Sequence, residues 1–136
     1  GLQYMIQRLV RGEAVELYDG GEAMRDYLYV DDVCRALKTC VERAPLGEIV
    51  NVGSGVPLAV GELVEYCRLR LGSQSRVERV ETPAFRRQVQ ARDFWLDVTR
   101  LTRLGFAPSV DFQSGLDRVM DAELALAGKL PLPARP

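Results

Sequence analysis

The sequence contains no histidine, and this absence removes several kinds of site at once. Histidine-based metal centres and the Ser-His or Cys-His pairs of nucleophilic enzymes are excluded. No apolar run approaches the ~18–20 residues that are needed to span a bilayer. A net charge of -1 also argues against a dedicated nucleic-acid binder, which usually carries a clear positive excess.

Lysine is nearly absent as well. Lys38 and Lys129 are the only two, so that Arg supplies almost all of the 18 basic residues. A GC-rich genome explains this bias, and recognition of an anion such as phosphate by the Arg fork is the alternative. With 136 residues, 47% of them apolar, the composition indicates one globular domain with a real core.

The few cysteines, Cys34, Cys40 and Cys67, form no Cys-x-x-Cys pair, so neither a disulfide framework nor a zinc knuckle is indicated. All three lie in segments with helical patterning, and we expect buried free thiols in a reducing cytoplasm. The chain starts with Gly1 and its first residues lack a signal-peptide pattern, so we expect a piece of a longer protein. Residues 128–136 are rich in proline and are expected to form a disordered tail.

Hydrophobic periodicity predicts strands that alternate with helices, which indicates an α/β or mixed α+β fold. Helices are expected near residues 3–11, 31–44, 60–71, 98–104 and 112–126, and strands near residues 14–18, 27–30, 48–52 and 76–81. The inward face of the last helix is expected to carry Phe112, Leu116, Val119, Met120 and Leu124. Residues 82–97 are irregular and rich in Arg. We interpret Asp31 or Asp32 as the N-cap of the second helix rather than as a catalytic base.

Two glycines after the predicted strand at 48–52 invite comparison with a dinucleotide-binding loop. Gly53-x-Gly55 precedes a helix, but Leu58 stands where the fingerprint has its third glycine. We therefore interpret the loop as a structural turn with a left-handed glycine. The Tyr-x-x-x-Lys pair of short-chain dehydrogenases is missing too, because Lys follows none of the 5 tyrosines at that spacing.

The most informative segment covers residues 19–33. An Asp-Gly-Gly turn leads to Arg25 and Asp26, then to an aromatic stretch and an acidic helix start. Arg25 follows a loop and precedes a strand, where its guanidinium fork can face a ligand. The alternative is a surface ion pair of Arg25 with Asp26 or Asp31, worth under ~1 kcal/mol.

This segment resembles the extended short-chain dehydrogenase/reductase family, the NAD-dependent epimerases and dehydratases of nucleotide sugars. Members of that family carry a similar Arg-Asp and aromatic-Val-x-Asp series in their C-terminal half. The other stretches that resemble family signatures are, in order, Ile49-Val50-Asn51-Val52-Gly53-Ser54-Gly55, Ala59-Val60-Gly61-Glu62-Leu63-Val64, Arg87 with Asp97-x-Thr99-Arg100-Leu101, Leu104-Gly105-Phe106-Ala107-Pro108 and Ser114-Gly115-Leu116. Order and spacing agree over about residues 1–127.

The resemblance implies that residues 1–127 bind the nucleotide diphosphate of a UDP-, dTDP- or GDP-linked sugar. Arg25 and Arg87 would hold the pyrophosphate, with Arg86 as the alternative to Arg87. Leu17 and Tyr18 would line the nucleobase, largely through the backbone. The site would orient the sugar without doing chemistry itself, and no catalytic residue is expected in this chain.

The resemblance also implies a partner. A Rossmann domain upstream of Gly1 would bind NAD or NADP and supply Tyr-x-x-x-Lys, so we expect this chain alone to be inactive. The helix from Asp31 and the strand through Asn51 would pack on that domain. Without it, the chain would expose an apolar patch or form a homodimer. Gln88-Val89-Gln90 replaces the family's acidic residue after the second Arg, which affects one sugar or ribose contact.

Two other classes of protein stay open at this point. One is a binding module that senses a nucleotide or a nucleotide sugar without catalysis. The other is a protein-interaction domain whose Arg residues serve as surface solubilisers. The nucleobase, the sugar and the choice between epimerisation, dehydration and reduction are also open.

Overall fold

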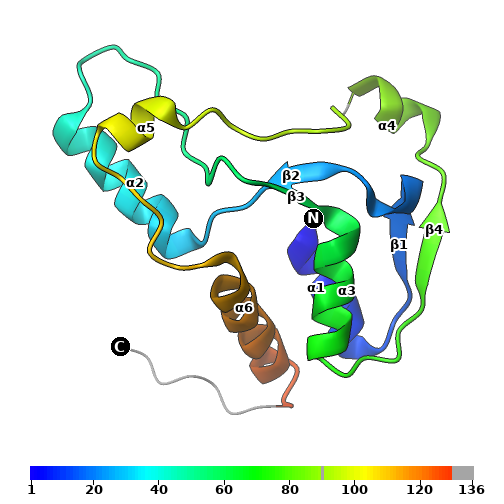
Figure 1. The fold of residues 1–136 in the computed structure, drawn as a ribbon. Helices are drawn as coiled ribbons and strands as arrows, with labels where there is room; N and C mark the ends of the chain where they lie inside the picture. Colours follow the sequence, from blue (N-terminus) through cyan, green and yellow to red (C-terminus); the bar gives the residue numbers. More distant parts are fainter. Residues whose placement is uncertain (90, 130–136) are drawn as a thin grey trace.

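The computed structural model describes residues 1–89 and 91–129, and it confirms a mixed α/β fold. The helices are α1 (Leu2–Arg11), α2 (Val30–Arg43), α3 (Val60–Arg70), α4 (Ala84–Val89), α5 (Thr99–Arg103) and α6 (Phe112–Leu126). The strands are β1 (Val15–Tyr18), β2 (Met24–Asp26), β3 (Pro57–Ala59) and β4 (Val77–Val80), and a 3-10 turn, η1 (Asp19–Gly21), follows β1. Figure 1 shows their arrangement.

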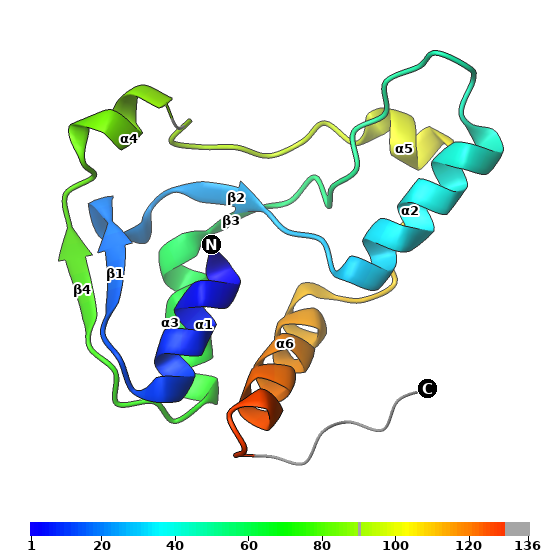
Figure 2. The same cartoon turned by 180° about the vertical axis from the view of Figure 1, so that it is seen from behind.

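The four strands form two small pairs. β1 runs parallel to β4, with Val15 opposite Val77 and Tyr18 opposite Val80. β2 runs antiparallel to β3. Because β1 and β4 are parallel, the residues that follow them lie at the same edge of the pair. Both views place α2 and α5 at the end of the molecule away from β1 and β4 (Figures 1 and 2).

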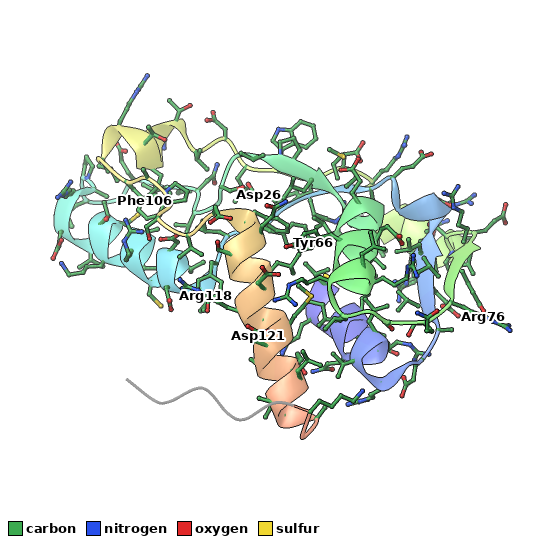
Figure 3. All side chains as sticks on the ribbon, turned by 60° about the horizontal axis from the view of Figure 1, so that its bottom comes forward. Asp26, Tyr66, Arg76, Phe106, Arg118 and Asp121 are labelled. Atoms are coloured by element: carbon green, nitrogen blue, oxygen red, sulfur yellow. The ribbon has the colours of Figure 1, made fainter. Side chains whose placement is uncertain are left out.

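The main core lies where α1, α3 and α6 pack against one another and against β1. Its buried members are Ile6, Leu9, Val10, Val15, Leu17, Val64, Cys67, Leu116 and Met120. The predicted inward face of the last helix is confirmed, since Phe112, Val119 and Leu124 also pack against this cluster. Tyr66 lies between α3 and α6, where its hydroxyl donates to Asp117 at 3.1 Å (Figure 3).

A second, smaller core joins α2 to α5. Ala36, Leu101 and Phe106 are buried together, and Val50 and Val52 pack against them. Phe106 lies beside α2 in Figure 3. This cluster explains why one predicted strand is wrong: residues 48–52 contribute side chains to it from irregular backbone. The described residues 1–89 and 91–129 bring no strand beside this segment, so its backbone has no ladder to join.

The aromatic strand prediction at 27–30 is also wrong. The strand is β2, three residues earlier, and its partner β3 was not predicted. Cross-strand pairing decides this placement, because Arg25 lies opposite Leu58 while residues 27–29 have no strand neighbour among the described residues. In the predicted irregular stretch 82–97, residues Ala84–Val89 form the short helix α4.

Asp32 is not the N-cap of α2, which begins at Val30 after Tyr29. Its fully buried carboxylate instead accepts the N–H groups of Ser109 and Val110, each at 2.9 Å. Asp32 therefore fixes α2 to the loop that precedes α6. A capping prediction failed here because the partners lie about 77 residues away in sequence.

The exposed surface of α2 includes an apolar stripe. Val30, Cys34, Leu37 and Val41 are spaced along one stripe of the helix, and all four are exposed. Leu46 and Ile49 extend the exposed apolar surface beyond the helix. The prediction of buried thiols is thus wrong for Cys34, whereas Cys67 is buried and Cys40 is half-buried.

The end of α6 is closed by Gly128, whose N–H reaches the Ala125 carbonyl at 3.0 Å, and by Lys129. The rest of the predicted tail, residues 130–136, lies outside the described residues. Within the part of the chain that the structure describes, no helix has the length and apolar character to cross a membrane.

Candidate functional site

A cavity of about 650 Å³ lies at the carboxyl edge of the parallel pair β1–β4. Its walls come from the start of α1, the end of β1 with η1, β2, α4 and the segment that follows α4. The four predicted site residues, Leu17, Tyr18, Arg25 and Arg87, all line this one cavity, and so does Arg86. The fold therefore brings together side chains that three separate segments contribute.

Arg25 lines the cavity from β2, and its guanidinium already donates hydrogen bonds to backbone carbonyls. Nη1 donates to the carbonyl of Met24 at 2.6 Å and to that of Arg92 at 2.5 Å, and Nη2 donates to the carbonyl of Ala91 at 3.2 Å. The alternative interpretation of Arg25, an ion pair with Asp26 or Asp31, is not observed among the described residues. Of the five N–H donors of an Arg, two keep no partner among those residues. Arg25 thus fixes the segment after α4 and still retains donors for an anion.

Arg87 lines the cavity from α4 and faces Asp19. Its Nη2 lies 3.7 Å from Asp19 Oδ1, and 55% of its side chain is exposed. Asp19 is bound more tightly by Thr82, whose hydroxyl and N–H donate to it at 2.7 and 3.1 Å. These bonds from Thr82 hold the pKa of the Asp19 carboxyl below its ordinary value. Arg87 is therefore held in place loosely, with its fork open to solvent.

Arg86 differs from its neighbour in what it touches. Its guanidinium lies 4.6 Å from the centroid of the Tyr18 ring, a stacked cation–π contact. Arg86 and Arg87 thus both line the cavity, and the choice between them as anion ligand stays a prediction.

The walls carry more positive than negative charge. Arg25, Arg86, Arg87 and Arg92 line the cavity together with two carboxylates, Asp19 and Asp26. The Asp26 carboxylate is occupied, because it accepts hydrogen bonds from Ser54, Gly55 and Leu96. What remains is an electropositive hollow suited to an anion with several oxygens. Over residues 1–89 and 91–129, no cluster of side chains suited to a metal ion is found.

The glycine loop outside the cavity has a structural role. The N–H groups of Ser54 and Gly55 donate to the two oxygens of Asp26 at 2.8 and 3.0 Å. Gly55 has φ +73°, and a Cβ at Gly53 would lie 2.7 Å from Asp26 Oδ2. The predicted turn with a left-handed glycine is confirmed at Gly55, and the N–H groups of the loop bind the Asp26 carboxylate.

Asp19, Thr82 and Arg92 also line the cavity with polar side chains, and sequence reasoning did not place them there. A signal for two of them was present. Asp19 follows the predicted strand at 14–18, and Thr82 follows the one at 76–81. Had these strands been paired in parallel, the two side chains would have been expected at one edge.

Comparisons with known proteins identify the family of this chain. The model of the NAD dependent epimerase/dehydratase family matches residues 2–53. A Low-salt glycan biosynthesis protein, Agl12, of Haloferax volcanii is 35% identical over 85% of this chain and 36% of its own length. A dTDP-glucose 4,6-dehydratase of Streptomyces griseus is 37% identical over 82% of this chain and 33% of its own length.

Among solved structures, a UDP-glucose 4-epimerase of Thermotoga maritima crystallised with UDP-glucose matches with a TM-score of 0.79. It is 30% identical over 88% of this chain and 38% of its own. The epimerase Mth375 of Methanothermobacter thermautotrophicus has a TM-score of 0.82 at 20% identity, which supports the fold alone.

Sequence and fold together define the class: an α/β protein of the short-chain dehydrogenase/reductase type. The chain belongs to the NAD dependent epimerase/dehydratase family. It spans about a third of the length of the curated relatives it matches.

Proposed function

We propose that this chain binds the nucleotide diphosphate of a nucleotide sugar, as the substrate-binding portion, residues 1–127, of an NAD(P)-dependent epimerase or dehydratase. One observation carries the proposal: Leu17, Tyr18, Arg25 and Arg87 line the same electropositive cavity. Its volume of about 650 Å³ lies within the range of ~300–1,000 Å³ that small-molecule sites occupy.

The diphosphate would lie between Arg25 and Arg87. Arg25 keeps two N–H donors after its carbonyl contacts, and Arg87 would exchange its long contact to Asp19 for phosphate oxygens. Each charge-assisted hydrogen bond contributes roughly 1.5–3 kcal/mol net. Two guanidinium forks from different segments, β2 and α4, would also fix the orientation of the diphosphate.

The nucleobase would lie against Leu17 and Tyr18. Leu17 is buried in the main core, so this wall is rigid. Tyr18 presents an aromatic ring that Arg86 covers at 4.6 Å. This arrangement supports an apolar slot for a flat base beside the arginines that hold the phosphates.

Contacts to the diphosphate and the nucleobase would orient the sugar but would not take part in its reaction. Such remote contacts lower the entropy of the reacting complex and hold the substrate in position. NAD(P), when bound to the complete enzyme, supplies hydride transfer. The Gly53–Gly55 loop does not fit that cofactor, because Asp26 takes its N–H groups, so we propose that residues outside this chain hold it.

The stripe of Val30, Cys34, Leu37 and Val41 on α2 supports a partner surface. Exposed apolar stripes of this kind on one helix face are typical of contact surfaces. We propose that this stripe packs against the cofactor-binding part of the enzyme. A homodimer through the same stripe is the alternative, and size-exclusion chromatography with light scattering separates the two.

Calorimetry with UDP-, dTDP- and GDP-linked sugars tests the proposed function. Arg87→Ala is expected to weaken binding by more than about tenfold, because it removes charge-assisted bonds and touches no buried contact. Arg25→Ala is expected to do the same, with circular dichroism showing that the fold is kept. Arg11→Ala, an exposed change outside the cavity, is the matched control.

Equal affinities for Arg87→Ala and the control would overturn the assignment of Arg87. If none of the three nucleotide sugars binds the unmodified protein, the cavity is not a nucleotide-sugar site and the protein-interaction class is favoured instead.

A further inference from the structure

We infer that Asp19 and Thr82 are positioning residues that set Arg87 over the cavity. The inference deepens the proposed function and rests on it. Neither side chain is expected to carry the ligand's charge. Their contribution is to join the two parallel strands just beyond their last paired residues, where α4 departs.

Two hydrogen bonds join Asp19 and Thr82, and we call this pair of bonds the clasp. Thr82 Oγ1 donates to Asp19 Oδ2 at 2.7 Å, and Thr82 N–H donates to Asp19 Oδ1 at 3.1 Å. Tyr18 and Val80 are the last paired residues of β1 and β4, so the clasp closes the pair at the cavity edge. Arg87 approaches the same Asp19 oxygen at 3.7 Å.

On the Asp19 side of the clasp, the backbone is held rigidly. Asp19 has φ +45°, the single positive value at a non-glycine residue among those described. Gly20 and Gly21 continue the left-handed turn, and a Cβ at Gly21 would lie only 2.6 Å from Gly61 Cα. The turn is therefore packed against α3 and points the carboxylate in one direction.

On the other side of the clasp, Thr82 determines where α4 begins. α4 has six residues and none of them is buried, so no core contact fixes its place. Its arginines touch the body of the protein through Tyr18 and Asp19. Thr82 lies two residues before α4, and its two bonds to Asp19 are the nearest anchor for that helix.

A neutral change in Thr82 tests this without altering the charge of the cavity. Thr82→Val keeps the shape and the N–H donor but removes the hydroxyl bond. We expect its Kd for UDP, dTDP or GDP, whichever binds the unmodified protein, to rise about threefold to tenfold. Affinity for the matching nucleoside, which has no phosphate, is expected to stay unchanged. Thr82→Ser, which restores the hydroxyl, is expected to recover the original Kd.

A double-mutant cycle separates positioning through Arg87 from a general loss of structure. In the Arg87→Ala background, Thr82→Val is expected to have no further effect on diphosphate affinity. Full additivity of the two changes, or an equal loss of nucleoside affinity, would overturn the inference. The same holds if Thr82→Val binds as well as the unmodified protein while Arg87→Ala does not. If no nucleoside diphosphate binds the unmodified protein, it is the proposed function that fails.

Discussion

Asp26 and Ser54, 28 residues apart, are joined by two hydrogen bonds to one carboxylate oxygen. The N–H and the hydroxyl of Ser54 donate to Asp26 Oδ1 at 2.8 and 2.6 Å. The second oxygen accepts from the N–H groups of Gly55 and Leu96. Asp26 thus joins β2 to the loop at Ser54 and Gly55 and to the backbone at Leu96. Its carboxylate binds the N–H groups of that loop.

Asp26→Asn is expected to destabilise the protein by roughly 2–4 kcal/mol, because an amide presents N–H groups to donors and loses the charge. The free energy of unfolding in urea measures this. Glu22→Gln, a similar change in an exposed side chain of an ion pair, is the control and should cost under ~0.5 kcal/mol. Equal losses in the two variants would contradict the role of Asp26.

Gly21→Ala and Gly12→Ala form a matched pair. Both glycines have left-handed backbone, with φ +78° and +76°, so each Ala costs about 1–2 kcal/mol of strain. A Cβ at Gly21 meets Gly61 Cα at 2.6 Å, whereas one at Gly12 meets nothing within 4 Å. We expect an additional loss of about 1–3 kcal/mol at Gly21. Thermal unfolding followed by circular dichroism compares the two, and equal melting temperatures would show that Gly61 moves aside.

Asp32 should make stability depend on pH on the acid side. Burial by itself raises the pKa of its carboxyl, but the N–H groups of Val110 and Ser109, the Ser109 hydroxyl and Arg35 together hold the pKa below the ordinary 3.8. The stabilisation is complete above 3.8, where the unfolded chain is ionised too. It is lost as the pH falls from there through the lower pKa of the folded state.

Asp32→Asn is therefore expected to cost roughly 3 kcal/mol near neutral pH and progressively less in the acid range. Urea unfolding at several pH values follows the difference between the two proteins. Asp31→Asn, at the exposed neighbouring position, should leave the acid profile as it is. A difference that stays constant down to acid pH would argue against an ionised Asp32 in the fold.

The cysteines should differ sharply in reactivity toward a disulfide reagent. Burial, with a smaller effect of Asp117, raises the pKa of Cys67 to about 11, so its thiolate is scarce and covered. Cys34 is exposed and should react rapidly in the native protein at mildly alkaline pH. Cys67 should react only after unfolding, and Cys34→Ser should remove the fast phase. Slow labelling of Cys34 would mean that the α2 stripe is covered in solution.

Five of the six helices in the described residues were predicted, because their signal is local, whereas α4 was not. The expected range 112–126 is the observed α6, since its apolar spacing lies within the segment and its capping Asp111 directly precedes it. The strands depended on distant partners. Residues 48–52 have strand-like composition and form none, while Pro57–Ala59 pairs only because β2 lies beside it.

The residues of the candidate site were predicted from the family resemblance alone. Leu17, Tyr18, Arg25 and Arg87 do line one cavity. Composition and spacing could not show that Arg25 binds the carbonyls of residues 91 and 92, because these belong to a stretch without periodicity. Nor could they show the bond from Thr82 to Asp19, which requires the register of β1 on β4.

That register has a kinetic consequence. Val15 pairs with Val77, so the cavity edge closes a long loop that contains α2 and α3. Loop closure of this length is entropically costly and slow compared with the formation of a helix. During synthesis, α1 and β1 emerge from the ribosome well before β4 and must wait for it. The cavity edge of this strand pair is thus expected to be one of the last parts of the chain to fold.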